Sequence, residues 1–131
     1  MRGSLVPPDV PLHRTRVERF DDLVLLAVSQ LEPRWETELS GIEFAVEEIP
    51  PAEPDPDEVE PVPLSRLEPG SAAFGEPDRP ARIILYRRPL MARADGQEEL
   101  AELVLDVIVE QFARWLGVDP QTVDPSYPGD E

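Results

Sequence analysis

The sequence predicts a small α+β domain in which two helices pack on one sheet. Three observations support this prediction. A nearly all-apolar helical stretch lies at Gln97–Gly117, a second helix with its own capping signal lies near the N-terminus, and the segments between them have the patterns of strands. At 131 residues the chain is long enough for one hydrophobic core but not for two.

The composition excludes several classes of function. A net charge of −16 opposes binding to nucleic acid or to anionic lipid, and it is typical of a solvated acidic surface. The absence of cysteine excludes disulfides, thiol catalysis and thiolate metal sites. The first residues hold no apolar core of the length that a signal peptide or a membrane span requires, so we expect a cytoplasmic protein.

The N-terminal third predicts an arm followed by a helix. Residues 1–14 contain three prolines and should form an extended arm. Thr15 and Glu18 have the spacing of a capping box, which predicts a helix over about Arg16 to Leu31 with apolar residues on one face. Pro33 interrupts this helix, and Trp35 to Leu39 can add a turn or two.

Three segments predict strands. Ile42 to Ile49 begins with apolar and polar residues in alternation, the period of a half-buried strand. Val62 to Leu67 predicts a short edge strand, since proline confines it to an edge. Ala81 to Arg87 is apolar on both faces and predicts a more central strand. Residues 69–80 are expected to form a loop.

The acidic, proline-rich segment 50–63 predicts a mobile surface loop. Its composition offers too little apolar area to offset the entropy of ordering it. Such a loop could also dock a basic partner. We favour the simpler interpretation, in which the loop has no function of its own and the fold tolerates its length.

The long helix is the element that the rest of the chain should cover. Asp95 and Glu98 suggest a capping box at its start, and Gly117 suggests a left-handed residue at its end. Arg88 to Leu90 should end the preceding strand, with a linker to Asp95. Beyond the helix we expect a short helical turn at residues 120–123, a domain boundary near 124 and a frayed tail at 125–131. Apolar residues cover most of the helix and leave one polar row, which consists of Glu102, Asp106, Glu110 and Arg114.

The sequence offers few residues suited to catalysis. His13 is the only histidine, so one chain cannot build a histidine-based triad or a multi-histidine metal site. No phosphate-binding or dinucleotide-binding glycine motif occurs. Asp106 and Glu110 form the best pair of carboxylates, but a hard cation would need further oxygen ligands. The favoured alternative is a solvent-facing row in which Glu110 pairs with Arg114.

The sequence resembles the minimal zincin-like metallopeptidases. In that family a strand ending in an Arg-Arg-Pro-Leu-like turn precedes a long helix with the motif His-Glu-x-x-His, followed by x-x-Gly-x-x-Asp. Residues 83–90 (IILYRRPL) match the strand and turn, and the helix keeps the family's length as far as Gly117. Val62 to Arg66 also resembles the family's middle segment. The resemblance spans roughly Phe20 to Val123 and implies a zincin-like fold with a few-stranded mixed sheet against a long active-site helix and an N-terminal helix.

The residues at the motif positions depart from the family. Counting back from Gly117, the two histidines correspond to Glu110 and Arg114, and the catalytic glutamate to Gln111. The third ligand position falls on Pro120, beside Asp119. Zincin chemistry uses two imidazoles to hold zinc and a carboxylate to activate its water. A guanidinium cannot ligate a cation and an amide cannot accept the water's proton. We therefore expect no catalytic residue, no cofactor and no zinc, with Asp106, Glu110 and Asp119 as weak metal-ligand candidates.

Two hypotheses follow from the resemblance, and a third does not depend on it. The favoured one is a catalytically degenerate zincin-like protein that acts as a binding or regulatory module with an unknown protein partner. The second is a residual metal-dependent hydrolase that uses carboxylates alone, and the third is a soluble domain whose role its residues do not reveal. For partner contacts we consider Arg87 and Arg88, which belong to a basic stretch of arginines at positions 79, 82, 87, 88 and 93. The favoured alternative is that these arginines neutralise nearby acids of the same chain.

Overall fold

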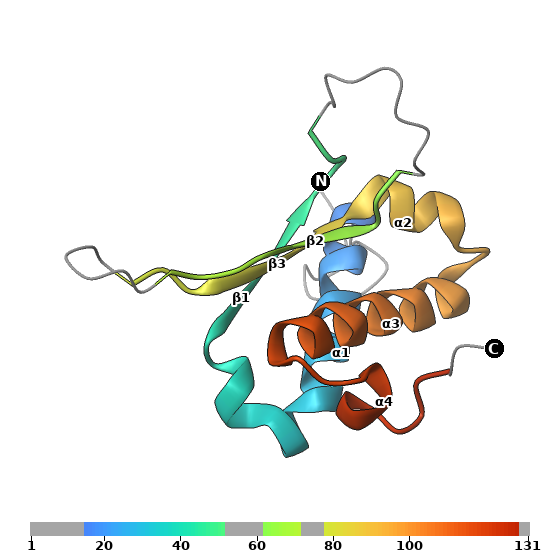
Figure 1. The fold of residues 1–131 in the computed structure, drawn as a ribbon. Helices are drawn as coiled ribbons and strands as arrows, with labels where there is room; N and C mark the ends of the chain where they lie inside the picture. The colour runs from blue at the N-terminus through green and yellow to red at the C-terminus, as the bar shows by residue number, and fades with distance from the viewer. Residues whose placement is uncertain (1–14, 52–61, 72–77, 129–131) are drawn as a thin grey trace, which may run out of the picture.

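The fold was analysed in a computed structural model, which describes residues 15–51, 62–71 and 78–128. It is an α+β domain in which helices cover one face of a three-stranded mixed sheet (Figure 1). The predicted fold class is confirmed. The expected arm at 1–14, most of the acidic loop at 50–63 and the end of the tail lie outside the described residues. None of the helices in the described ranges is long and apolar enough to cross a membrane.

Helix α1 (Arg16–Leu39) begins as its sequence predicts. The Thr15 hydroxyl accepts a hydrogen bond from the Glu18 N–H at 3.1 Å, and the Glu18 carboxylate accepts one from the Thr15 N–H at 2.9 Å. This capping box satisfies two of the N–H groups that a helix leaves unpaired at its start. The helix contains Pro33 and bends at Trp35, whose φ of −128° is not helical, so the proline kinks the helix without ending it.

The sheet has the order β1-β3-β2, with β3 (Ala81–Tyr86) in the centre. Strand β1 (Ile42–Glu47) is parallel to β3, and β2 (Ser65–Glu68) is antiparallel to it. The predictions of a half-buried first strand, an edge strand and a central strand are confirmed. Ala81, Ile83 and Leu85 face the main core on the helix side. They alternate with two residues that are buried on the other face, Ile84 and Tyr86.

Two residues between β2 and β3 pair with each other. Ser71 and Arg79 exchange two backbone hydrogen bonds of 2.8 and 3.0 Å, which extends the antiparallel ribbon past Glu68. Gly70 permits this close approach, because a Cβ atom at that position would lie 2.2 Å from the Arg79 carbonyl oxygen. The predicted loop at 69–80 is therefore paired at both of its ends.

Helix α3 (Gln97–Leu116) ends as predicted but begins differently. Gly117 adopts φ 79° and ψ 32°, and the Val118 N–H donates to the Ala113 carbonyl at 3.0 Å, the pattern of a Schellman motif. The predicted capping box between Asp95 and Glu98 is absent. Gly96 occupies the N-cap position, so the Asp95 side chain lies one residue too early. The backbone N–H of Asp95 instead donates to the Glu99 carboxylate at 2.6 Å.

A short helix, α2 (Arg87–Arg93), replaces the predicted linker after the central strand. Pro89 is its third residue. The first turn of a helix has no internal partners for its N–H groups, so a proline there removes no hydrogen bond. We expected Arg88 to Leu90 to end the strand and a linker to follow; the strand ends at Tyr86, and Pro89 lies in the first turn of a helix. The burial of Leu90 against the core fixes the helix in place.

The core lies between α3, α1 and the helix-facing side of the sheet. Val104, Ile108, Val109 and Phe112 of α3 have no exposed surface at all. Phe20, Val24, Ala27 and Leu31 of α1 pack in the same cluster. The nearly all-apolar composition of α3 thus corresponds to a helix covered on several sides, as predicted.

The C-terminal residues close the far end of the domain. Helix α4 (Pro120–Val123) is the predicted helical turn, and its Val123 is buried. The Trp35 indole N–H donates to the Val123 carbonyl at 2.9 Å, which joins α4 to the bend in α1. Tyr127 packs against the core cluster, so the chain still contacts the domain after α4.

We predict that truncation of the α3 core destabilises the protein strongly. Phe112→Ala or Ile108→Ala should lower the free energy of unfolding by about 2–5 kcal/mol, because each leaves a cavity in a fully buried site. Urea denaturation measures this. Leu26→Ala is the matched control, since Leu26 is 52 % exposed, and it should have a much smaller effect. Equal effects at all three positions would contradict this packing.

Candidate functional site

The C-terminal half of α3 carries the residues at the motif positions. Glu110 and Arg114 are exposed on the polar row of the helix, and Gln111 beside them is half-buried. The same row contains Asp106, which is also half-buried. The predicted solvent-facing row therefore exists, but its polar side chains differ in how deeply they are buried.

Gln111 joins α3 to the edge strand β2. Its side-chain amide donates to the Ser65 hydroxyl at 2.7 Å, across 46 positions of sequence. Its carbonyl oxygen is buried and has no hydrogen-bond partner among the described residues. A buried acceptor without a partner costs stability, so the Ser65 contact and the packing around it must hold the side chain in this position. Sequence reasoning did not identify Ser65, although it lies in the segment that resembles the family.

Glu110 is engaged by the C-terminal segment. Its carboxylate accepts a hydrogen bond from the Tyr127 hydroxyl. We expected Arg114 as its partner, but within the described residues no ion pair joins Glu110 to Arg114. Tyr127 was assigned to a frayed tail, and its 17-residue separation from Glu110 gave no local signal for the contact.

The weak metal-ligand candidates do not converge. Asp119 is exposed at the N-cap of α4, where its side chain makes no capping hydrogen bond, and Pro120 begins that helix. Across residues 15–51, 62–71 and 78–128 there is no group of three or more histidine, cysteine, aspartate or glutamate side chains that could hold a metal ion. Asp106, Glu110 and Asp119 therefore do not form a cation site together.

Asp106 is the acid on this row whose titration is altered. Burial raises the pKa of its carboxyl above the ordinary value, and the negative charges of Glu110, Glu102 and Asp124 add to the increase. The cause is the burial of a carboxylate among other acids. This part of α3 favours a neutral or positively charged neighbour.

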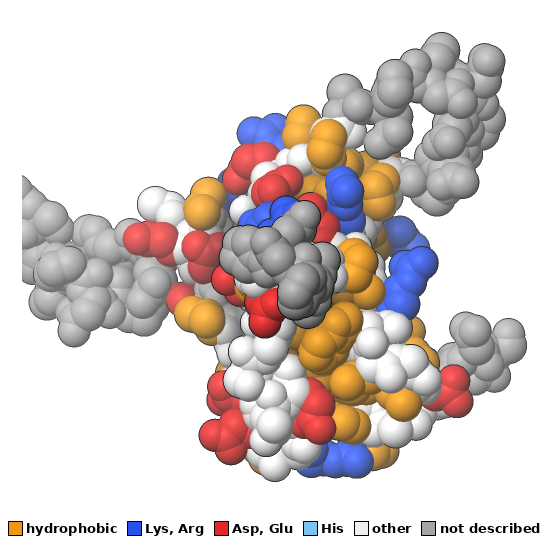
Figure 2. All heavy atoms as spheres, turned by 60° about the vertical axis from the view of Figure 1, so that its left-hand side comes forward, with side chains coloured by type: hydrophobic (Ala, Val, Ile, Leu, Met, Phe, Trp, Pro, Cys, Tyr) orange, Lys and Arg blue, Asp and Glu red, His pale blue; other side chains and the backbone are white. Residues whose placement is uncertain are grey.

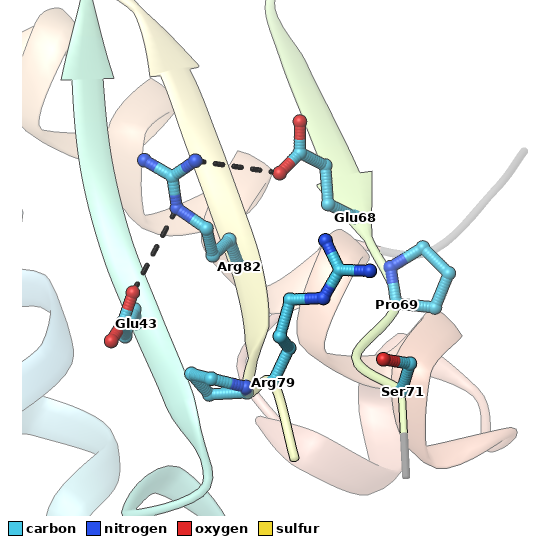
Figure 3. A pocket seen from close by; sticks show the side chains of 7 residues that line it. Glu43, Glu68, Pro69, Ser71, Arg79 and Arg82 are labelled. Carbon is cyan, nitrogen blue, oxygen red and sulfur yellow. Dashed lines mark hydrogen bonds and ion pairs between the residues drawn. The ribbon is translucent and has the colours of Figure 1, made fainter. Parts of the chain in front are cut away.

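The basic stretch is largely neutralised by acids of the same chain. Arg82 lies between Glu43 and Glu68 on the outer face of the sheet, at 3.8 and 3.4 Å, in a row across all three strands (Figure 3). Arg79, Ser71 and Pro69 line a hollow of about 610 Å³ beside this row. The hollow contains as many acids as arginines, so it has no strong preference for an anion.

Arg87 and Arg88 both bind Glu48, directly after β1. Arg87 contacts both carboxylate oxygens, one of them at 2.9 Å, and Arg88 donates to one oxygen at 3.3 Å. The Arg87 hydrogen bond holds the pKa of the Glu48 carboxyl below its ordinary value. Their geometry supports internal neutralisation over partner contacts, because both guanidinium groups already have an acidic partner.

Comparison with known families gives one match. The family model described as zincin-like metallopeptidase matches residues 39–129, which is 91 of the chain's 131 residues. No curated protein matches the chain. The matched region runs from the end of α1 to the C-terminal segment and includes the whole sheet, α3 and α4.

We predict that Asp106 makes stability depend on pH. Because its pKa is raised in the folded state, the folded protein holds this proton more tightly. Stability should therefore decrease as the pH rises from the unfolded pKa of about 3.8 through the folded value. Asp106→Asn should stabilise the protein at pH 7 and lose this advantage near pH 3. Urea midpoints measured at both pH values test this.

Asp119→Asn is the matched control for this prediction. Asp119 lies outside the set of charges that raise the Asp106 pKa, and its side chain makes no capping hydrogen bond. Its substitution should not reproduce the pH-dependent gain. A destabilising Asp106→Asn at pH 7 would show that the carboxylate is stabilised by a group that this arrangement does not contain.

Proposed function

Because the chain belongs to the zincin-like metallopeptidase family, we propose that it has kept this scaffold, lost the metal chemistry and acts as a binding or regulatory module. The proposal rests on the identity and the hydrogen bond of Gln111, the residue at the general-base position. Its amide is a structural link to Ser65, and an amide cannot accept a proton from a metal-bound water.

The residues at the ligand positions do not fit zinc. Tight zinc sites use imidazole or thiolate, and no such group is present at positions 110, 114 and 120. Glu110 offers one carboxylate, which already accepts a hydrogen bond from Tyr127. The guanidinium of Arg114 would place a positive charge beside a metal ion and repel it. Pro120 has no side-chain donor atom.

The carboxylate-only hydrolase has less support. Such a site would need several oxygen ligands around one point, and Asp106, Glu110 and Asp119 do not provide them together.

We predict that the purified protein contains no stoichiometric zinc and has no zinc-dependent peptidase activity. Elemental analysis after dialysis against micromolar zinc, together with titration calorimetry, measures the first, and a general peptide substrate mixture measures the second. Stoichiometric zinc that is lost on mutation of Glu110 or Asp119 would refute the proposal and favour the carboxylate hydrolase.

Restoring the motif tests the assignment of positions. The variant with Glu110→His, Gln111→Glu, Arg114→His and Pro120→Asp should bind one zinc ion. The Ser65 hydroxyl can donate to a glutamate at position 111, so this change keeps a hydrogen bond to β2. A control variant with Gln111→Glu alone should bind none. A folded restored variant without zinc would show that these are not the ligand positions.

A further inference from the structure

The outer edge of β1 is open in the described part of the chain. The sheet order is β1-β3-β2, so β1 pairs with β3 on one side and with no described strand on the other (Figure 1). An open edge presents backbone N–H and C=O groups that can pair with another extended chain, and natural sheets usually cover or protect such an edge.

A groove runs beside this edge, between α1 and β1, with a volume of about 460 Å³. Two apolar residues of α1 in its lining are unusually exposed: Leu25 has 67 % of its surface exposed and Val17 has 43 %. Phe44 and Val46 of β1 line the opposite wall and are only half-buried. Apolar surface on both walls is thus left partly uncovered by the described residues.

The two acids in the lining, Asp21 and Glu48, do not give the groove a free negative charge. The Arg87 guanidinium binds Glu48 directly, and Asp21 is close enough to act on the same guanidinium through its charge. Arg88 also donates to Glu48. The groove is therefore mainly apolar, and an occupant should bury apolar side chains in it without bringing charge.

Helix α1 runs antiparallel to β1. Residues 40 and 41 join the end of the helix to the start of the strand, whereas Asp21, in the second turn of the helix, lines the groove with Glu48, beyond the end of the strand. The chain therefore enters α1 from the end of the groove at which β1 finishes. A segment that precedes α1 and lies beside β1 would run parallel to it. A helix between two parallel strands is the usual β-α-β connection.

The residues directly before α1 have the sequence pattern of such a strand. In residues 9–12 (DVPL), Val10 and Leu12 alternate with an aspartate and a proline, so the two apolar side chains would share one face. Pro11 has no N–H, which an edge strand tolerates when that nitrogen faces outward, and the N–H groups of Val10 and Leu12 would then face β1. Residues 13 and 14 suffice as the loop to the helix.

We propose that residues 9–12 of the same chain fill this groove as a fourth strand parallel to β1, with Val10 and Leu12 against Leu25 and Val17 of α1. The short connection to α1 gives this segment an effective concentration on the order of millimolar, so it has the advantage over a second copy. The segment would cover the edge on which other chains could pair. This inference goes beyond the proposed function and does not depend on it.

Amide hydrogen exchange on the full chain tests the added strand. Alternate amides of β1 point to β3 and the others to the open edge, and both sets should be protected if residues 9–12 pair with β1. Val10→Ser or Leu12→Ser should make the edge-facing amides exchange roughly tenfold faster, or about 1.4 kcal/mol. Asp9→Ser is the matched control, because its side chain would face away from the groove and the exchange rates should not change.

Variants of α1 and methyl contacts locate the segment. Nuclear Overhauser effects should join the methyl groups of Val10 or Leu12 to those of Leu25, and a mixture of isotope-labelled and unlabelled protein should show that they arise within one chain. Leu25→Ser should accelerate exchange at the β1 edge. Leu26→Ser is the matched control, since Leu26 is 52 % exposed and does not line the groove, and it should have no such effect.

Three outcomes would overturn the inference. They are rapid exchange of the edge-facing β1 amides in the unaltered chain, equal effects of Asp9→Ser and Val10→Ser on that exchange, and methyl contacts that arise only between two chains. The last outcome would assign the groove to a second copy. The substituted residues are exposed in α1 or precede it, so none of these variants opens a cavity in the core.

Discussion

The burial of α3 on several sides is the constraint on which the rest of the structure depends. A helix with this much apolar surface is not stable in water, so other elements must cover it. The central strand β3 covers one side, α1 covers another, and α4 closes the C-terminal end. The sheet is too small to form a core by itself, and among the described elements α3 supplies more of the fully buried side chains than any other.

This constraint also explains how residues at the motif positions can differ without loss of the fold. The core of α3 depends on Val104, Ile108 and Phe112, whereas Glu110 and Arg114 lie on its exposed row. Substitutions on that row change the available ligands without opening a cavity, so they have little effect on stability. On the face drawn in Figure 2, many hydrophobic side chains gather in one area, and most of the acidic ones lie around it.

The sequence predicted the elements whose signals are local. The Thr15 capping box, the left-handed Gly117 and the alternation in β1 each depend on a few neighbouring residues, and the structure contains all three. The false capping box at Asp95 failed because Gly96 shifts the start of α3 by one residue. Helix α2 was missed because a proline has opposite effects in the first turn and in the interior of a helix.

The helix that carries the candidate positions could be predicted from the sequence, but the contacts of these positions could not. The spacing to Gly117 identified positions 110, 111 and 114 on one helix. Their partners come from distant segments: Ser65 is 46 residues from Gln111, and Tyr127 reaches Glu110 from beyond α4. Neither contact has a periodic pattern, because each depends on how the helix meets the sheet and the C-terminal segment. The groove between α1 and β1 likewise forms only when α1 packs on the sheet.

The order of the strands in the sheet has a consequence for how the chain folds as it is synthesised. The central strand β3 is the last of the three to leave the ribosome, since β1 and β2 precede it in the sequence. Until residues 81–86 appear, neither earlier strand has the neighbour with which it pairs. The helix that covers the sheet follows later still. Both strands therefore lack their native partner in the nascent chain until β3 has been made.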